Sequence, residues 1–404
     1  MDVADTAAAE RGRAQPHGEV NLPAWRFGLL LSAALAVTMA YGVTLPSVPG
    51  LVERLQPQTG LDVARHTGWL TAVYTLGLFL FSPVWGALSD RIDRRAVIAL
   101  GLLGGGAALW GLEGARSLGA LYLARGAAGA LSAAVLPAVF SYIVEVSVPG
   151  RRQKRFAWVA SATALGFLLG PVAGNALKAL ASSPFVAVAL VSFAAAACMV
   201  LLPPCPMRAD SPAGGPAIDE ARIRHSLMMT ALVVLGITVA EVGLTLLSRA
   251  SPVIAPSHVA GYFALCSVVM VAVQMWLYPA LERWLGEPRL LAAALTGMAL
   301  GLALLAWPVA RWVLAVSFVL GASGIGVLIP ALAVRISVVA GARQGWALGR
   351  QASAANLGQA VGAAATGMLY AQAPALPFLA AAAMLAGAAW TARPRPHATD
   401  SGAR

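Results

Sequence analysis

The chain has 404 residues, of which 59% are hydrophobic and only 11% are charged. Soluble globular domains carry about 25% charged residues, so this composition excludes a soluble protein. The formal net charge of +11 would suit a nucleic-acid partner, but the basic residues lie mainly between apolar runs. That placement is typical of membrane orientation and not of phosphate binding, so no nucleic-acid partner is expected.

Apolar runs of about 20 residues recur along the whole chain, which is the length that one helix needs to cross a hydrocarbon core of about 30 Å. Because lipid satisfies no backbone polar group, each run is expected to be a helix. The sequence therefore predicts an all-α membrane protein with twelve transmembrane helices. The expected spans are 27–49, 66–88, 96–112, 119–144, 156–180, 184–203, 226–248, 258–280, 289–310, 312–338, 345–370 and 376–392.

The distribution of basic residues predicts the orientation. Most Lys and Arg residues fall in the tails 1–26 and 393–404 and in the loops on the same side, which the positive-inside rule assigns to the cytoplasm. The few on the other side are Arg54, Arg65, Arg116, Lys178, Arg249 and Arg311. We therefore expect a multi-pass monomer in the lipid bilayer of a cell inner membrane, with both termini in the cytoplasm.

One long inner segment, 204–225, is rich in Pro, Gly and charge, and it is interpreted as a cytoplasmic linker. It separates a six-helix bundle at 27–203 from a second at 226–392.

The two halves also repeat each other at an offset of 192 residues. At this offset the Ala-Ser-Ala of 160–162 meets the Ala-Ser-Ala of 352–354, and Leu165-Gly166 meets Leu357-Gly358. Parallel repeats of this kind are known in secondary transporters. The repeat therefore predicts two pseudo-symmetric halves.

The turn between the second and third spans reads Gly86-x-x-x-Asp90-Arg91-x-x-Arg94-Arg95. This spacing resembles the loop between helices 2 and 3 of major facilitator superfamily transporters, where a glycine usually stands in place of Asp93. The resemblance implies the major facilitator fold. It also implies a gating role for these residues, because in the family the loop holds the two halves together in the outward-open state. The alternative is a plain basic loop that only orients the chain.

The fifth span contains Gly166-x-x-x-Gly170-Pro171-x-x-Gly174. Small residues four apart allow helices to approach closely, and a proline removes one backbone hydrogen bond. The pattern resembles the antiporter motif of drug-efflux branches of the superfamily, with Asn175 at the place of its last glycine. The resemblance implies export coupled to inward proton flow. The alternative is ordinary packing of membrane helices.

Arg125 lies inside the fourth apolar span, and Glu241, in the seventh, is the only carboxylate well inside a span. Charges are costly there, so they usually face a cavity or a partner. In the family, helices 1, 4, 7 and 10 line the central cavity, which implies that both residues face it from opposite halves. We expect Glu241 to carry a coupling proton and Arg125 to sense its charge. The alternatives are snorkelling of Arg125, and a neutral Glu241 that hydrogen-bonds in the bundle or contacts a cationic substrate.

Other polar side chains in apolar spans are candidates for substrate contacts or for ties between helices. They are Tyr41, Tyr74, Gln274, Asn356 and Gln359. We expect Glu145, at the inner end of the fourth span, to pair with inner-loop arginines.

The pattern as a whole predicts a secondary transporter that exports a small organic molecule, a drug or a self-made metabolite such as a siderophore, by proton antiport and alternating access. The alternative within the same fold is a proton-linked uptake symporter. An intramembrane enzyme is less favoured, because no catalytic set of His, Asp, Glu or Cys gathers in the spans. A transport-inactive sensor is less favoured, because a sensor usually appends a soluble domain and the tails here are short. No cofactor or metal is expected, since Cys198, Cys205, Cys266 and the five histidines lack metal-ligand spacing.

Overall fold

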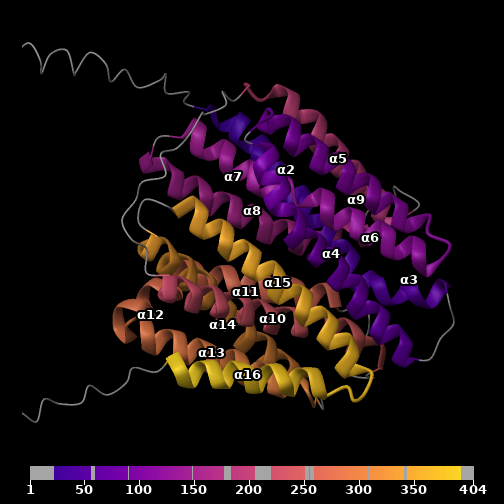
Figure 1. Cartoon of the computed structure of the whole chain (residues 1–404). Helices are drawn as coiled ribbons and strands as arrows, with labels where there is room; N and C mark the ends of the chain where they lie inside the picture. Colours follow the sequence, from indigo (N-terminus) through magenta and orange to yellow (C-terminus); the bar gives the residue numbers. More distant parts are fainter. Residues whose placement is uncertain are drawn as a thin grey trace, which may run out of the picture.

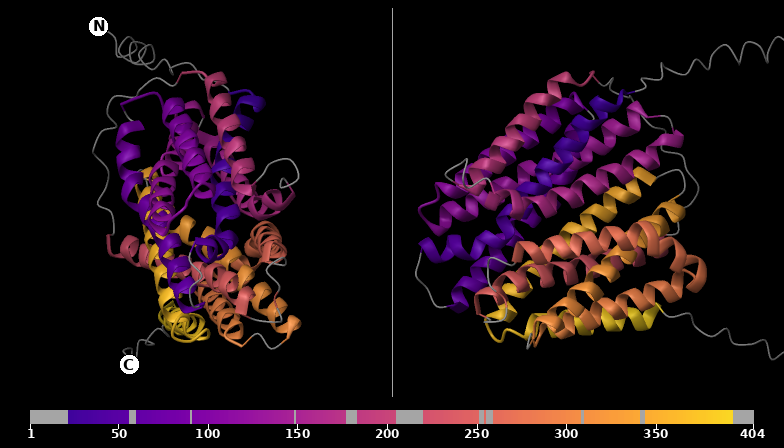
Figure 2. Two further views of the ribbon diagram at one scale, coloured as in Figure 1. Left: turned by 90° about the vertical axis from the view of Figure 1, so that its right-hand side faces the viewer. Right: turned by 180° about the vertical axis from the view of Figure 1, so that it is seen from behind.

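The computed structural model describes residues 22–55, 60–89, 91–147, 149–176, 183–204, 220–250, 254, 259–307, 310–340 and 344–392. Within these ranges every regular element is a helix (Figure 1). The earlier helices gather in one group and the later ones in a second group beside it, and all run broadly along one direction (Figure 2). The all-α membrane fold predicted from the sequence is confirmed.

The helices of the first group follow the first six predicted spans. They are α2 (Ala24–Thr44), η1 (Leu45–Ser47), α3 (Val48–Leu55), α4 (Gly60–Ser89), α5 (Arg94–Glu113), α6 (Leu118–Ser132), α7 (Val135–Val146), α8 (Pro149–Ala176), α9 (Pro184–Cys198) and η3 (Met199–Leu201). The fourth predicted span is therefore two helices, α6 and α7, which a turn at Ala133 and Ala134 separates.

The helices of the second group follow the other six spans. They are α10 (Glu220–Ala250), α11 (Val259–Ala272), the π-helical η5 (Val273–Leu277), α12 (Tyr278–Leu285), α13 (Glu287–Leu305), α14 (Arg311–Ala340), α15 (Gln344–Tyr370) and α16 (Leu376–Ala392). The eighth predicted span thus consists of three segments, with a π-helical stretch in its middle.

Among the described residues, 8 helical segments are long and apolar enough to cross a membrane. The shorter apolar helices, 158–170, 261–277 and 376–392, coincide with three further predicted spans. The eleventh predicted span coincides with α15. The protein is therefore a multi-pass membrane protein, while the count of twelve spans and the boundaries of the two bundles stay predictions. Most of the predicted linker, residues 205–219, lies outside the described residues.

Short polar side chains satisfy the backbone at helix starts and within spans. The Ser117 hydroxyl accepts a hydrogen bond from the Ala120 amide at the start of α6, at 3.2 Å, which is a typical N-cap. Inside α4, Thr67 and Thr71 donate to carbonyl oxygens four residues earlier, at 2.7 and 2.9 Å. These buried hydroxyls are not left unsatisfied, because the helix itself supplies their hydrogen-bond partners.

The two groups of helices meet most closely at one end. We call the end that carries Arg91–Asp93 the loop end, and the end that carries η1, α3 and Ala250 the far end. Near the far end, α4 crosses α15, and a methyl group built onto Gly68 would lie 2.7 Å from the Gly367 Cα atom. Leu45, Ala64 and Ala72 of the first group, all from the far half of their helices, belong to the buried core of the second group.

The repeated glycines pack in the same way in both halves. A methyl group on Gly166 or Gly170 of α8 would collide with the backbone of α2, for instance with the Leu35 carbonyl oxygen. In the second half, a methyl group on Gly358 of α15 would collide with the Ala231 carbonyl oxygen of α10. The repeat detected in the sequence therefore reflects one helix crossing that is used twice.

Two alanine substitutions are expected to change stability in opposite directions. Gly166→Ala places a Cβ atom against the α2 backbone, and overpacking of this kind costs about 1–3 kcal/mol. Gly297→Ala on α13 meets no atom within 4 Å, and alanine stabilises a helix by up to about 1 kcal/mol relative to glycine. Thermal unfolding of the detergent-solubilised protein measures both. Equal melting temperatures for the two variants would contradict the close α2–α8 crossing.

Candidate functional site

Arg125 lies on α6 with its side chain buried in the first half. Its guanidinium carbon is 4.5 Å from the centroid of the Tyr74 ring, and its Nε donates to the Leu70 carbonyl oxygen at 3.3 Å. Its Nη2 atom is buried and has no hydrogen-bond partner among the described residues. A cation over an aromatic face is stabilised by about 2 kcal/mol when both are desolvated. Tyr74 therefore holds the charge in place while one N–H group stays available.

A row of aromatic rings leads from Tyr74 to the second half. Tyr41 on α2 stacks on Tyr74 with ring centroids 5.3 Å apart and on Phe167 of α8 at 5.8 Å. Phe167 in turn contacts Phe263 of α11, with centroids 5.8 Å apart. The row crosses from one half to the other, so it brings aromatic faces to the boundary between them.

Glu241 lies on α10 of the second half and meets the same row. The Glu241 carboxyl group lies near the Tyr41 hydroxyl, and Gln359 Nε2 of α15 donates to the Tyr41 oxygen at 2.9 Å. The Oε2 atom of Glu241 is buried and has no hydrogen-bond partner among the described residues. Tyr41 of the first half thus contacts the second half through Gln359.

Five of the predicted site residues therefore come together in one continuous set of contacts, which we call the central cluster. Its members are Arg125, Tyr74, Tyr41, Glu241 and Gln359.

Two predicted substrate contacts do not join the central cluster through any hydrogen bond in the described part of the chain. Asn356 lies on α15 three residues before Gln359, so it shares that helix face one turn closer to the loop end. Gln274 lies in the π-helical η5. Sequence reasoning missed Phe167 and Phe263, which carry no signal that separates them from ordinary core residues.

The central cluster contains two buried polar atoms that have no hydrogen-bond partner among the described residues. Buried polar atoms normally have partners, and an unsatisfied one costs free energy. Here a guanidinium N–H and a carboxyl oxygen are both unsatisfied, they belong to opposite halves, and aromatic faces lie between them. Such a site suits a proton and an organic molecule with polar groups. In the described part of the chain, no three His, Cys, Asp or Glu side chains gather as a metal site requires.

The predicted antiporter motif lies on α8 beside the central cluster. Gly166 and Gly170 face α2, whose Tyr41 belongs to the central cluster, and they let the two backbones approach. Pro171 and Gly174 follow on the same helix. The glycine contacts are shared with the second half, so they explain packing. A specific role of the motif in antiport stays a prediction.

The predicted gating loop makes its described contacts within the first half. Arg94 pairs with Glu145 of α7 at 2.5 Å, as expected for Glu145, and both side chains are largely buried. Arg91 is exposed, and Gly86 lies in the last turn of α4 with no atom near its added Cβ position. Asp90 lies outside the described residues. The gating role of the loop stays a prediction.

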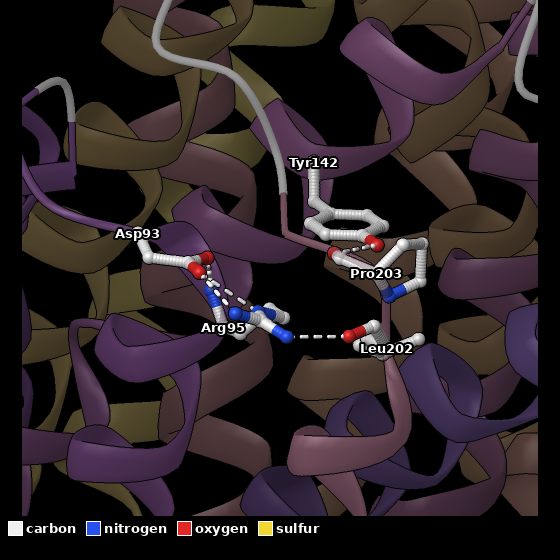
Figure 3. Close-up of polar contacts among 5 residues, drawn as sticks. All are labelled: Asp93, Arg95, Tyr142, Leu202 and Pro203. Carbon is white, nitrogen blue, oxygen red and sulfur yellow. Dashed lines mark hydrogen bonds and ion pairs between the residues drawn. The ribbon is translucent and has the colours of Figure 1, made fainter.

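Asp93, which stands where the superfamily usually has glycine, begins α5 (Figure 3). Its carboxylate accepts from the Arg95 amide at 3.0 Å and from the Arg95 Nε at 2.8 Å. Arg95 Nη1 then donates to the Leu202 carbonyl oxygen at 2.6 Å, and the Tyr142 hydroxyl donates to the Pro203 oxygen at 2.9 Å. The departure from the pattern therefore supplies an N-cap and fixes the chain where it leaves the first half.

Asp93→Ala is expected to destabilise the protein, because it removes the N-cap of α5 and releases Arg95. Loss of an N-cap typically costs about 1 kcal/mol. Asp93→Asn keeps an oxygen for the Arg95 amide and loses only the ion pair, so its melting temperature should lie between those of Asp93→Ala and the wild type. The same unfolding assay tests this order, and an Asp93→Ala protein as stable as the wild type would contradict it.

Comparison with known proteins identifies the family. The sequence profile of the Major Facilitator Superfamily matches residues 30–337. The chain is 26% identical over 362 residues to multidrug resistance protein 2 of Bacillus subtilis, covering 85% of this chain and 88% of that protein. It is 32% identical over 171 residues to the class B tetracycline resistance protein of Escherichia coli, covering 41% and 40% of the two chains.

The fold also matches solved transporters. The crystal structure of the human organic anion transporter MFSD10 superposes with a TM-score of 0.70 at 22% identity, covering 92% of this chain and 100% of that one. The match extends over both groups of helices. The profile, the relatives and the fold agree, and they identify a transporter and not an enzyme: the chain belongs to the major facilitator superfamily.

Proposed function

We propose that this transporter is a proton-coupled antiporter that exports a small organic molecule by alternating access. The observation that carries the proposal is the central cluster, in which Glu241 and Arg125 from opposite halves connect through Tyr41 and Tyr74. The relatives named for multidrug and tetracycline resistance support export. The loop end then faces the cytoplasm and the far end faces outward.

The proton acts at the joint between the halves. An ionised Glu241 attracts Arg125, so it favours the arrangement in which the halves meet at the central cluster. Protonation removes that charge and weakens the attraction across the boundary. Because the two access states differ in how the halves meet, protonation shifts the population between them.

The substrate contacts the same residues. Tyr41, Tyr74 and Phe167 present aromatic faces, which bind planar organic groups through burial and stacking. Gln359 and the unsatisfied N–H of Arg125 supply hydrogen bonds. The proton on Glu241 and the substrate on these neighbouring side chains therefore both act where the two halves meet, so each of them shifts the population between the two access states. We propose a drug or a self-made metabolite as the cargo.

Transport in liposomes tests the direction of coupling. Purified protein is reconstituted into liposomes that enclose an acidic buffer. Ethidium or tetracycline is then added to an outside buffer of higher pH. An antiporter accumulates a probe as protons leave, and adding the probe to loaded liposomes raises the internal pH. Uptake only when protons flow inward with the probe would contradict antiport and indicate a symporter.

A comparison of culture medium and cell extract tests for a self-made cargo. Wild-type and deletion strains are grown with and without iron, and secreted compounds are measured without preselection. A compound that accumulates in deletion cells and disappears from their medium is the expected result for a dedicated exporter. If the amount of no secreted compound changes, the proposal that the protein exports a self-made metabolite is wrong. Foreign molecules are then the cargo to test.

A further inference from the structure

An ion pair joins the two halves at the far end, between residues that are distant in the sequence. Arg249, in the last turn of α10, contacts the Glu53 carboxylate of α3 through its Nη1 atom. Glu53 belongs to the first half and Arg249 to the second. The side chains are 44% and 33% exposed, so water and ions reach the pair.

The surroundings of the pair are shaped to admit the arginine. A methyl group built onto Gly50 would lie 2.9 Å from Arg249 Nη2, so a side chain at this position would displace the guanidinium group. Five residues before Gly50, Leu45 is completely buried in the core of the second half. The segment from Leu45 to Glu53 therefore docks against the far end of α10 through one apolar contact and one ionic contact.

A second ion pair at the same end serves as an internal comparison. Arg54, next to Glu53, pairs with Glu113 of α5 at 3.5 Å, and their side chains are 48% and 35% exposed. Both partners belong to the first half. The two pairs share the helix end, the charge types and a similar exposure, but only the Glu53–Arg249 pair breaks when the halves separate at the far end.

We propose that Glu53 and Arg249 form a latch that favours closure of the far end, and that Gly50 leaves the space in which the latch closes. The proposal rests on the alternating access assumed in the proposed function, but not on proton coupling at Glu241. Breaking an exposed ion pair changes an equilibrium by up to about fivefold. The latch therefore biases the two access states without locking either one.

Cys266 offers a native reporter for the far end. It lies on α11 seven residues after its first residue, about 10 Å from the far end of that helix. With Cys198→Ser and Cys205→Ser, Cys266 is the single thiol of the chain. Its rate of labelling by a membrane-impermeant maleimide, added to right-side-out or inverted vesicles, reports how often the far end opens.

Charge reversal separates the latch from a general surface effect. Glu53→Arg and Arg249→Glu should each raise the labelling rate from the far side by up to about fivefold, and the double variant should restore the wild-type rate. The control variants Arg54→Glu and Glu113→Arg should leave the rate unchanged. Equal labelling in all variants, or the same increase in the controls, would overturn the proposal.

A crosslink tests the latch without relying on charge. In a protein with Glu53→Cys and Arg249→Cys and no other cysteine, a short bifunctional thiol reagent should abolish ethidium transport, and a cleavable version should allow recovery. Full transport by the crosslinked protein would overturn the latch. The labelling assay needs neither substrate nor pH gradient, so its result stands even if Glu241 proves unrelated to proton coupling.

Discussion

Glu241→Gln is expected to abolish transport driven by a pH gradient while leaving probe binding intact. Glutamine keeps the size of the side chain, but it cannot bind or release a proton. The rate of ethidium uptake into acid-loaded liposomes should fall to the level measured without a gradient. Ethidium binding, measured by fluorescence of the detergent-solubilised protein, should stay within about twofold of the wild type, because aromatic contacts supply most of the buried area.

The matched control for this prediction is Glu113→Gln. Glu113 lies at the far end, outside the central cluster, and it pairs with Arg54. Its substitution should leave gradient-driven transport unchanged. Wild-type transport by Glu241→Gln under a pH gradient would exclude Glu241 as the proton carrier, and loss of both binding and transport would indicate that Glu241 contacts the substrate directly.

The sequence predicted the residues of the central cluster better than their arrangement. Arg125 and Glu241 were recognisable because charge is rare and costly inside an apolar span, and that argument needs no coordinates. The position of Tyr41 between them was not predictable. A tyrosine inside a span can link two helices or contact a substrate, and the sequence does not separate these roles. The role of Tyr41 depends on the crossing of α2, α4 and α10, which sets which rings face one another.

Other features depended on contacts between distant parts of the chain. Asp93 appeared in the sequence only as a departure from a pattern, and its value as an N-cap depends on the first turn of α5. The Glu53–Arg249 pair joins residues 196 positions apart, and either residue alone looks like an ordinary surface charge. Hydropathy predicts each membrane span from its own residues, because each span meets the lipid separately. Contacts between side chains of the two halves depend on tertiary packing, which local sequence does not show.

The second large effect is expected at Arg125. In Arg125→Gln the cation over the Tyr74 ring is lost, which removes a stabilisation of up to about 2 kcal/mol. An ionised Glu241 then has no positive charge in the first half to attract. Gradient-driven ethidium transport should therefore fall to the background level.

Arg125→Lys separates the charge from the geometry. Lysine keeps the cation, but it presents a compact ammonium group in place of the planar guanidinium that stacks on Tyr74 and donates to the Leu70 carbonyl oxygen. Transport should be reduced yet remain dependent on the pH gradient, and it should exceed that of Arg125→Gln in the same liposomes. Thermal unfolding of both variants shows whether each is folded before transport is compared. If folded Arg125→Gln transports at the wild-type rate under the gradient, the charge of Arg125 has no part in coupling, and Glu241 must exchange its proton with water alone.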